Sequence, residues 1–222
     1  MSQPHIDSST LDRRSQILDA ALVCFGKRGF HQTSMHDISS EAGISVGLIY
    51  RYFENKEAVI SAMADQHKKE ISEMLERAQQ APTLLESLEI LFTAHCCENQ
   101  PRVISAFVVD LYAEASRNSH VADLVRDVLK AYMDGLRELI ARAPEAQAAS
   151  HGLTPNEMAE LISAVERGML MLDVLRPEEM TAGERRARQL EVTRRLWRLL
   201  FESETHSGRP DGSGRQLETA YA

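Results

Sequence analysis

Apolar side chains recur at intervals of three and four residues along most of the chain. The first such segment, residues 12–28, carries Ile17, Ala20, Ala21, Cys24 and Phe25 at that spacing. In an α-helix these positions fall on one face, so the segment predicts a helix that buries a single stripe. We find no strand-like alternation of apolar and polar residues of any length, and Ala, Leu, Glu and Arg dominate many segments. The pattern therefore predicts an all-α protein.

Capping residues mark the ends of the predicted helices. Gly29 follows the first helix in the manner of a C′ glycine. Thr154, Pro155 and Glu157 combine an N-cap, a proline at the first helical position and an acidic residue at the third. Residues 144–152 are rich in Ala, Ser and Gly and predict a loop. We expect about nine helices, over residues 12–28, 35–42, 45–53, 56–80, 84–97, 103–117, 120–143, 155–175 and 181–202.

The stretch from Gly43 to Lys56 predicts a turn, a short helix and the start of the next helix. Gly43 can adopt the left-handed conformation that ends a helix, and Ser45 is a good N-cap. Ile49 and Phe53 are one turn apart and form the buried face. The short helix then offers its N-terminal end and two tyrosines to solvent. This arrangement is typical of the recognition helix of a helix-turn-helix.

The overall charge does not favour nucleic-acid binding. The 222 residues carry a net charge of −8, and the pI is about 5.5. Residues 1–60 contain six Lys/Arg and seven Asp/Glu, so the acidic excess lies mainly in the rest of the chain. DNA binding by the N-terminal part must depend on where its cations, hydroxyls and helix N-termini lie. The cations are Arg13, Arg14, Lys27, Arg28, Arg51 and Lys56.

Targeting and cysteine patterns favour a reducing compartment. No N-terminal apolar signal region is present, and no apolar run approaches the ~18 residues of a membrane span, so we expect a cytoplasmic protein without membrane contacts. The three cysteines, Cys24, Cys96 and Cys97, are odd in number and lack CxxC spacing, which argues against a disulfide framework. Adjacent helical side chains point about 100° apart, so packing is favoured over a metal or redox site at Cys96 and Cys97.

Four segments carry a family resemblance: residues 30–35 (FHQTSM), 38–45 (ISSEAGIS), 47–53 (GLIYRYF) and 55–57 (NKE). Together they resemble the DNA-binding domain of the TetR/AcrR family of bacterial regulators over about residues 13–60. The remainder is similar to the family only in its helical architecture. The resemblance implies a disordered arm (1–11), a three-helix helix-turn-helix domain (12–57) and a connecting helix (56–80). A ligand-binding and dimerisation domain (81–204) and a disordered tail (205–222) complete the expected organisation.

The resemblance also implies which residues contact DNA. Hydroxyls at the start of the second helix, the first turn of the recognition helix, its tyrosines and the following lysine match contact positions of the family. Val46 and Leu48 have no hydrogen-bonding side chain, so contacts to thymine methyl groups are all they can add to base readout. This raises the share expected for Arg51, Tyr52 and DNA shape. The expected contacts are Thr33, Ser34, Ser45, Val46, Gly47, Leu48, Tyr50, Arg51, Tyr52 and Lys56.

Aromatic residues and methionines of the middle helices are candidates for a hydrophobic effector pocket, because such side chains suit adaptable binding surfaces. For each of them, ordinary packing in the helical core is the alternative. The candidates are Phe92, Phe107, Tyr112, Tyr132, Met133, Met169 and Met171, with Cys96 beside them.

The last two predicted helices are candidates for a dimer interface. Their apolar residues fall on one face of each helix, and small residues there allow close approach. Burial within one chain is the alternative. The expected interface residues are Leu161, Val165, Gly168, Met169, Leu172, Trp197, Leu200 and Phe201, with Leu190 and Leu196 beside them.

Together with the recognition-helix pattern, the resemblance to the TetR/AcrR family implies a homodimeric, ligand-responsive transcriptional regulator, most simply a repressor of a palindromic DNA operator. The effector would be a small hydrophobic or amphipathic molecule. No catalytic constellation, metal motif or Gly-rich phosphate loop is present, so neither enzyme activity nor a cofactor is expected. Two alternatives remain at this point. One is a helical small-molecule-binding protein or enzyme with a vestigial helix-turn-helix, and the other is a dimeric scaffold without a ligand.

Overall fold

The computed structural model describes residues 8–96, 102–148, 152–175 and 180–201, and every regular element in these ranges is an α-helix. The all-α prediction is confirmed. Ten helices are present in the described residues: α1 (Ser8–Arg28), α2 (Met35–Glu41), α3 (Val46–Tyr52), α4 (Lys56–Ala78), α5 (Leu84–Cys96), α6 (Arg102–Ala115), α7 (Ser119–Arg142), α8 (Pro144–Ala148), α9 (Pro155–Leu175) and α10 (Ala182–Phe201).

The main differences from the sequence prediction lie at the start of α1 and after α7, and the other helix ends agree to within two residues. Helix α1 begins at Ser8, so residues 8–11 belong to a helix and not to the expected arm; residues 1–7 and the expected tail lie outside the described residues. Residues 144–148 form the short helix α8 in place of a loop. Pro144 drives Ala143 into an extended conformation, which ends α7, and proline itself suits the first position of a new helix. The new helix buries Ala146.

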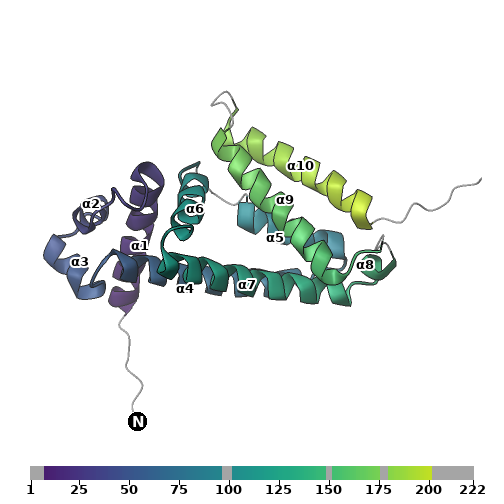
Figure 1. Ribbon diagram of the computed structural model, residues 1–222, viewed down its shortest axis with the longest axis horizontal. Helices are drawn as coiled ribbons and strands as arrows, with labels where there is room; N and C mark the ends of the chain where they lie inside the picture. Colours follow the sequence, from purple (N-terminus) through teal and green to yellow (C-terminus); the bar gives the residue numbers. More distant parts are fainter. Residues whose placement is uncertain (1–7, 97–101, 149–151, 176–179, 202–222) are drawn as a thin grey trace, which may run out of the picture.

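The helices are arranged along a long axis formed by α4 and α7 (Figure 1). Helices α1, α2 and α3 lie at one end, and α8, α9 and α10 lie toward the other, with α6 between them. Two clusters of buried apolar residues underlie this arrangement, one mainly in α1–α4 and the other in α4, α5 and α7–α10. Helix α4 contributes to both clusters, so it connects the two parts of the molecule.

Helix α6 packs closely on α1, and a glycine makes this approach possible. A side chain at Gly26 of α1 would collide with the backbone carbonyl of Val103 in α6. Phe25 of α1 stacks on Phe107 of α6 with ring centroids 5.8 Å apart. The N-terminal helices are therefore held on the rest of the chain by backbone proximity and by aromatic packing.

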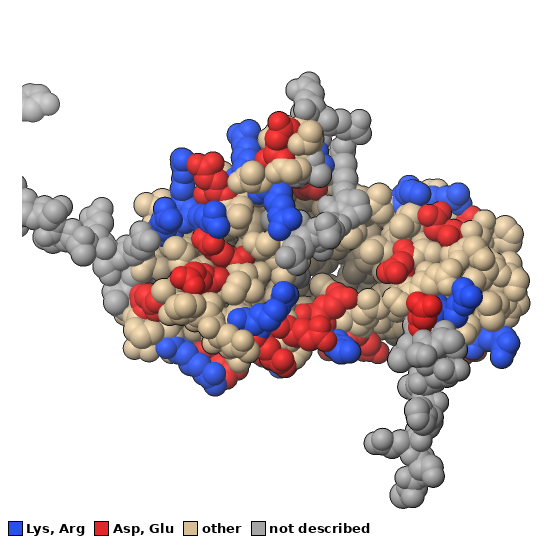
Figure 2. Space-filling model, turned by 180° about the vertical axis from the view of Figure 1, so that it is seen from behind, with Lys and Arg blue, Asp and Glu red and all other residues tan. Residues whose placement is uncertain are grey.

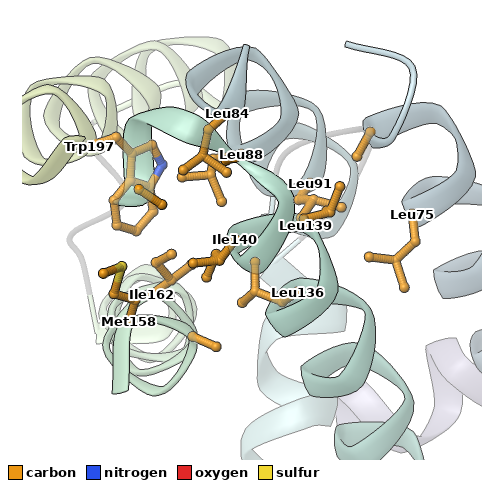
Figure 3. Packing of buried hydrophobic residues seen from close by; sticks show 14 of the residues in the cluster. Leu75, Leu84, Leu88, Leu91, Leu136, Leu139, Ile140, Met158, Ile162 and Trp197 are labelled. Carbon is orange, nitrogen blue, oxygen red and sulfur yellow. The ribbon is translucent and has the colours of Figure 1, made fainter. Parts of the chain in front are cut away.

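Trp197 of α10 is buried inside the C-terminal cluster, with 1% of its surface exposed. Figure 3 shows its indole between Leu84 and Leu88 of α5 on one side and Met158 and Ile162 of α9 on the other. Phe201 is buried in the same cluster. These two residues fix α10 onto its own chain, so the expectation that they form a dimer interface is wrong.

Within the described ranges, no helix is both long enough and apolar enough to cross a membrane.

Candidate DNA-binding surface and effector pocket

Helices α2 and α3 form a helix-turn-helix whose ends are fixed by local hydrogen bonds. Ser34 caps α2 by accepting from the Asp37 amide, and the Asp37 carboxylate accepts in return from the Ser34 amide at 2.9 Å. Gly43 takes a φ of 65° and turns the chain. Ser45 then caps α3 by accepting from the Leu48 amide at 3.2 Å. Each of these interactions spans only a few residues, which is why the turn at Gly43 and the cap at Ser45 could be predicted from the sequence.

Helix α3 divides cleanly into a buried and an exposed side. Ile49 is fully buried, and the C-cap residue Phe53 is buried beside it. Tyr50 is 53% exposed, Arg51 is exposed, and Val46 is exposed at the first turn. Gly47 is exposed as well, and Leu48 and Tyr52 are half-buried. The structure therefore brings together, on the outer side of α3, most of the residues expected to read DNA.

Helix α1 holds the helix-turn-helix in place. The Gln16 side chain donates to the Ala42 carbonyl at 2.7 Å, and the Arg14 guanidinium lies 4.6 Å from the centroid of the Phe53 ring. Arg28 pairs with Asp37 at 2.5 Å. The hydrogen bonds from Ser34, with the nearby Arg28, lower the pKa of Asp37 to about 2, so the capping carboxylate stays charged at neutral pH. Arg14 and Arg28 thus have partners within the domain, in the Phe53 ring and the Asp37 carboxylate respectively.

Thr33 and Lys56 do not occupy the positions expected of DNA contacts. Thr33 is buried, and its hydroxyl donates to the Gly29 carbonyl at 2.8 Å. The Lys56 ammonium donates to the carbonyls of Phe30 and Thr33, the latter at 3.0 Å, and lies 4.4 Å from the centroid of the Phe30 ring. Burial lowers the pKa of Lys56. Both side chains are turned inward onto the α1–α2 loop and donate hydrogen bonds to its backbone carbonyls. Their donors are thus engaged with the loop and do not face outward toward a DNA phosphate.

Acidic and basic side chains are intermingled over the face of the molecule drawn in Figure 2, and neither sign forms a continuous patch there. Near α3, Arg51 makes no ion pair with any residue that the structure describes. A recognition helix with one such cation and two tyrosines depends on contact geometry more than on bulk attraction.

A cavity of about 510 Å³ lies between α1, α4, α6, α7 and α9. This volume is in the range of small-molecule sites. Three of the residues expected in a pocket line it, namely Phe107, Tyr112 and Tyr132. Most of the remaining wall is aliphatic and includes Leu18, Leu22, Ile60, Met63, Ile71, Met74, Val108, Leu111, Leu124, Val128 and Leu170.

The other expected pocket residues lie elsewhere. Phe92 is fully buried in the C-terminal cluster, and Met133 packs against that cluster. Met169 and Met171 do not line the cavity, and Met171 is exposed. The side chain of Cys96, like all of Cys97, lies outside the described residues. Composition alone could not separate cavity wall from core, because both are apolar.

Two polar residues of α9 that the sequence did not single out line the cavity. Glu166 is 2% exposed, and its Oε2 accepts from the Tyr132 hydroxyl at 2.6 Å. Arg167 donates to Ser163 Oγ and, at 3.3 Å, to the Tyr112 hydroxyl. Burial raises the pKa of Glu166 to about 7, although Tyr132 and Arg167 both act to lower it. A buried glutamate among apolar helix positions was the feature that could have marked this site.

Residues 17–63 match the family described as bacterial regulatory proteins, tetR family. The matched segment holds most of α1, the whole helix-turn-helix and the start of α4. The chain belongs to the TetR family.

Relatives of this TetR-family regulator include the HTH-type nicotine-responsive transcriptional repressor HdnoR of Paenarthrobacter nicotinovorans. It is 27% identical over 143 residues, which cover 63% of this chain and 73% of the relative. The structure of Salmonella enterica GusR matches with a TM-score of 0.67 at 23% identity and covers 90% of this chain and 100% of that chain. Bacillus subtilis FadR in complex with stearoyl-CoA matches with a TM-score of 0.60 at 21% identity, covering 80% of this chain and 96% of that chain. The two structures support the fold, and the chain is a transcriptional regulator of the helix-turn-helix type.

In this TetR-family regulator, helix α6 connects the cavity wall to the helix-turn-helix. Asp110 of α6 accepts from the Phe30 amide at 2.8 Å. Glu114, one turn further on, is 1% exposed and accepts from His31 Nε2 at 2.7 Å and from Arg117 at 2.9 Å. Both acceptors hold the α1–α2 loop, which is also the loop held by Lys56. The same helix contributes Phe107, Val108, Leu111 and Tyr112 to the cavity.

An apolar stripe on α9 and α10 is exposed in the single chain. Leu161 and Leu172 are 46% and 47% exposed, as the dimer prediction requires, and Gly168 lies between them on the exposed side. Val165 and Leu200 are half-buried against the C-terminal cluster, and so is Leu196. The sequence did not single out the most exposed apolar residues, Leu175 at 73% and Leu199 at 76%, nor Val192.

Proposed function

We propose that this TetR-family regulator is a homodimeric repressor that binds a palindromic operator through α3 and releases it when a small hydrophobic or amphipathic effector enters the cavity. The observation that carries the proposal is the division of α3, which buries Ile49 and presents Val46, Tyr50 and Arg51 to solvent. The proposed contacts are Ser34, Ser45, Val46, Gly47, Leu48, Tyr50, Arg51 and Tyr52. Thr33 and Lys56 are left out because their polar groups are occupied.

The exposed stripe on α9 and α10 supports a dimer. Leu161, Leu172 and Leu175 lie at helical spacing on α9, and Val192 and Leu199 lie seven residues apart on α10. Two helices from each subunit would bury these residues in a four-helix interface. A two-fold dimer places its two α3 helices in successive major grooves, roughly 34–36 Å apart, and so matches a palindrome.

The cavity supports an effector because its walls are mostly aliphatic and its volume suits a small molecule. One relative is a nicotine-responsive repressor and another was solved in complex with stearoyl-CoA, two molecules of different chemistry. Similarity alone therefore supports an effector for this chain without giving its class.

Transmission is proposed to run through α6 and α4. Helix α6 lines the cavity with Phe107 and Leu111 and holds the α1–α2 loop with Asp110 and Glu114. Helix α4 also lines the cavity and holds the same loop with Lys56. An effector that shifts either helix would change the angle of the helix-turn-helix and hence the separation of the two α3 helices. This amounts to a shift between two states with different operator affinity.

A gel shift with the DNA that flanks the protein's own gene tests the proposal. We expect retardation by the wild-type chain, and a loss of at least about tenfold in affinity for Arg51→Ala, with a salt dependence reduced by about one counterion per site. Arg126→Ala, which removes an exposed arginine of α7 paired only with Asp123 in the described residues, is the matched control and should bind like wild type. Equal binding by the two variants, or no retardation at all, would contradict the proposed mode of binding.

A further inference from the structure

The buried carboxylate of Glu166 has an oxygen that the protein does not satisfy. Its Oε2 accepts from the Tyr132 hydroxyl at 2.6 Å, whereas Oε1 is buried and has no hydrogen-bond partner in the described residues. Glu166 lines the 510 Å³ cavity and is 2% exposed. Buried polar atoms are hydrogen-bonded in the great majority of cases, so an unsatisfied carboxylate oxygen at a cavity wall indicates a missing donor.

The neighbouring cation does not supply that donor. Arg167 extends toward Ser163 and toward the Tyr112 hydroxyl, at 3.3 Å from the latter. At the other side of the cavity, His67 and Gln66 of α4 both contact Glu70, at 3.2 and 3.0 Å. Asp19 and Arg77 also line the cavity but are exposed to solvent. Among the described side chains of the cavity wall, Glu166 Oε1 is therefore the acceptor that is both buried and open.

We propose that the cavity takes a hydrophobic amine whose protonated nitrogen donates to Glu166 Oε1 while its apolar body lies against the aliphatic wall. This inference rests on the proposed function of the cavity as the effector site, and it adds the chemical class of the effector. An ammonium group satisfies the open oxygen and compensates the buried negative charge at the same time. Leu18, Ile60, Ile71, Phe107 and Leu111 supply the surface for the apolar part.

Isothermal titration calorimetry of the full chain without DNA tests the class of ligand directly. Phenylbutylamine, phenylbutanol and phenylbutyrate each carry a phenyl ring on a short alkyl chain, and they end in an ammonium, a hydroxyl and a carboxylate respectively. We expect wild type to bind the amine at least about tenfold more tightly than the alcohol, because a hydrogen bond to a charged group is stronger than a neutral one.

Two variants assign this preference to Glu166. Glu166→Gln keeps the shape of the side chain and should bring amine and alcohol to within about threefold of each other. Glu160→Gln, the same change at an exposed position of the same helix, should leave the preference unchanged.

Proton release provides an independent readout. Burial raises the pKa of Glu166 to about 7, so amine binding below that pH must expel the carboxyl proton. Arg167 and Tyr132 lie beside this carboxyl, Tyr112 lies on α6, and Asp19, His67, Glu70 and Arg77 line the walls formed by α1 and α4. Titrations at pH 6 in two buffers of different ionisation enthalpy should show release for wild type and none for Glu166→Gln.

The inference would be overturned by equal affinity of wild type for amine and alcohol, by tightest binding of phenylbutyrate, or by an amine preference that survives in Glu166→Gln. Absence of amine binding would overturn it as well. The proposed function is tested separately, because a gel shift can show operator binding and release by another compound when the amine fails. Conversely, an amine that binds at Glu166 without affecting operator DNA would contradict the proposed function and leave the class of ligand standing.

Discussion

Removing the charge of Glu114 should loosen the connection between α6 and the helix-turn-helix. Glu114 is 1% exposed, and it accepts from His31 at 2.7 Å, from Arg117 at 2.9 Å and from Asn118 at 3.2 Å. Burial alone would raise the pKa of Glu114, but the hydrogen bonds from Asn118 and Arg117 and the charge of His31 outweigh it and leave that pKa below its ordinary value. The carboxylate form is therefore favoured in the folded protein.

The magnitude for Glu114→Gln follows from the hydrogen bonds that its carboxylate accepts from His31 and Arg117. A hydrogen bond to a charged group contributes about 1.5–3 kcal/mol, but the side chains of His31 and Arg117 are 64% and 55% exposed, which brings each pair down to ~1 kcal/mol or less. We expect a loss of about 1–2 kcal/mol in the free energy of unfolding at neutral pH. For a chain of this size, that corresponds to a fall of roughly 3–6 °C in Tm.

The assay combines thermal unfolding with hydrogen exchange. Amide protection in the α1–α2 loop should fall in the variant, whereas the C-terminal cluster around Trp197 should be unaffected. Because the pKa of Glu114 is lowered on folding, its contribution is present above its ordinary pKa and is lost as the pH falls through the folded value. The difference between wild type and variant should therefore disappear in acid. An unchanged Tm at neutral pH, or a loss of amide protection spread evenly over both apolar clusters, would refute the reasoning. The control is Glu73→Gln, the same change at an exposed position of α4.

Three further predictions follow from buried or exposed groups. Gly26→Ala should destabilise the protein by ~2 kcal/mol or more, measured by urea unfolding, because the added methyl group collides with the Val103 backbone; the same change at the uncrowded Gly168 should have little effect on the single chain. Glu166→Gln should raise the free energy of unfolding at pH 8 by up to about 3 kcal/mol and leave it unchanged at pH 4. Folding raises the pKa of the Glu166 carboxyl to about 7, so this group opposes folding once the pH exceeds the ordinary pKa of a glutamate. Equal unfolding free energies of variant and wild type at pH 8 would contradict this. Leu199→Glu should shift the sedimentation of the protein from dimer to monomer without lowering the secondary-structure content, because Leu199 is 76% exposed in the single chain, and a dimer that persists would place the interface elsewhere.

Interactions within a few residues were accessible from the sequence. The cap at Ser45 and the turn at Gly43 were predicted correctly, since each depends only on residues within the same turn. The burial of Ile49 and Phe53 also followed from helical spacing alone. The helix-turn-helix was therefore predictable as a unit, and the exposure of Tyr50 came with it.

Interactions between distant segments were not accessible. Lys56 stands at the position of a phosphate contact in the family pattern, but the α1–α2 loop offers its ammonium three carbonyls some 23 to 26 residues away. Trp197 lies on an apolar stripe that suits an interface, yet α5 and α9 cover it within the same chain. Periodicity shows that a residue prefers burial and does not show which surface buries it.

Local capping and 3.6-residue periodicity were enough to predict from the sequence that this chain is helical and that residues 43–56 form a turn and recognition helix. Which polar groups remain available depended instead on the packing of the helices. This packing turned Thr33 and Lys56 inward, placed Asp110 and Glu114 against the α1–α2 loop, and left one oxygen of Glu166 unsatisfied at the cavity wall. The physical reason is that a polar group's partners depend on which helices pack against it, and that packing joins residues far apart in the chain.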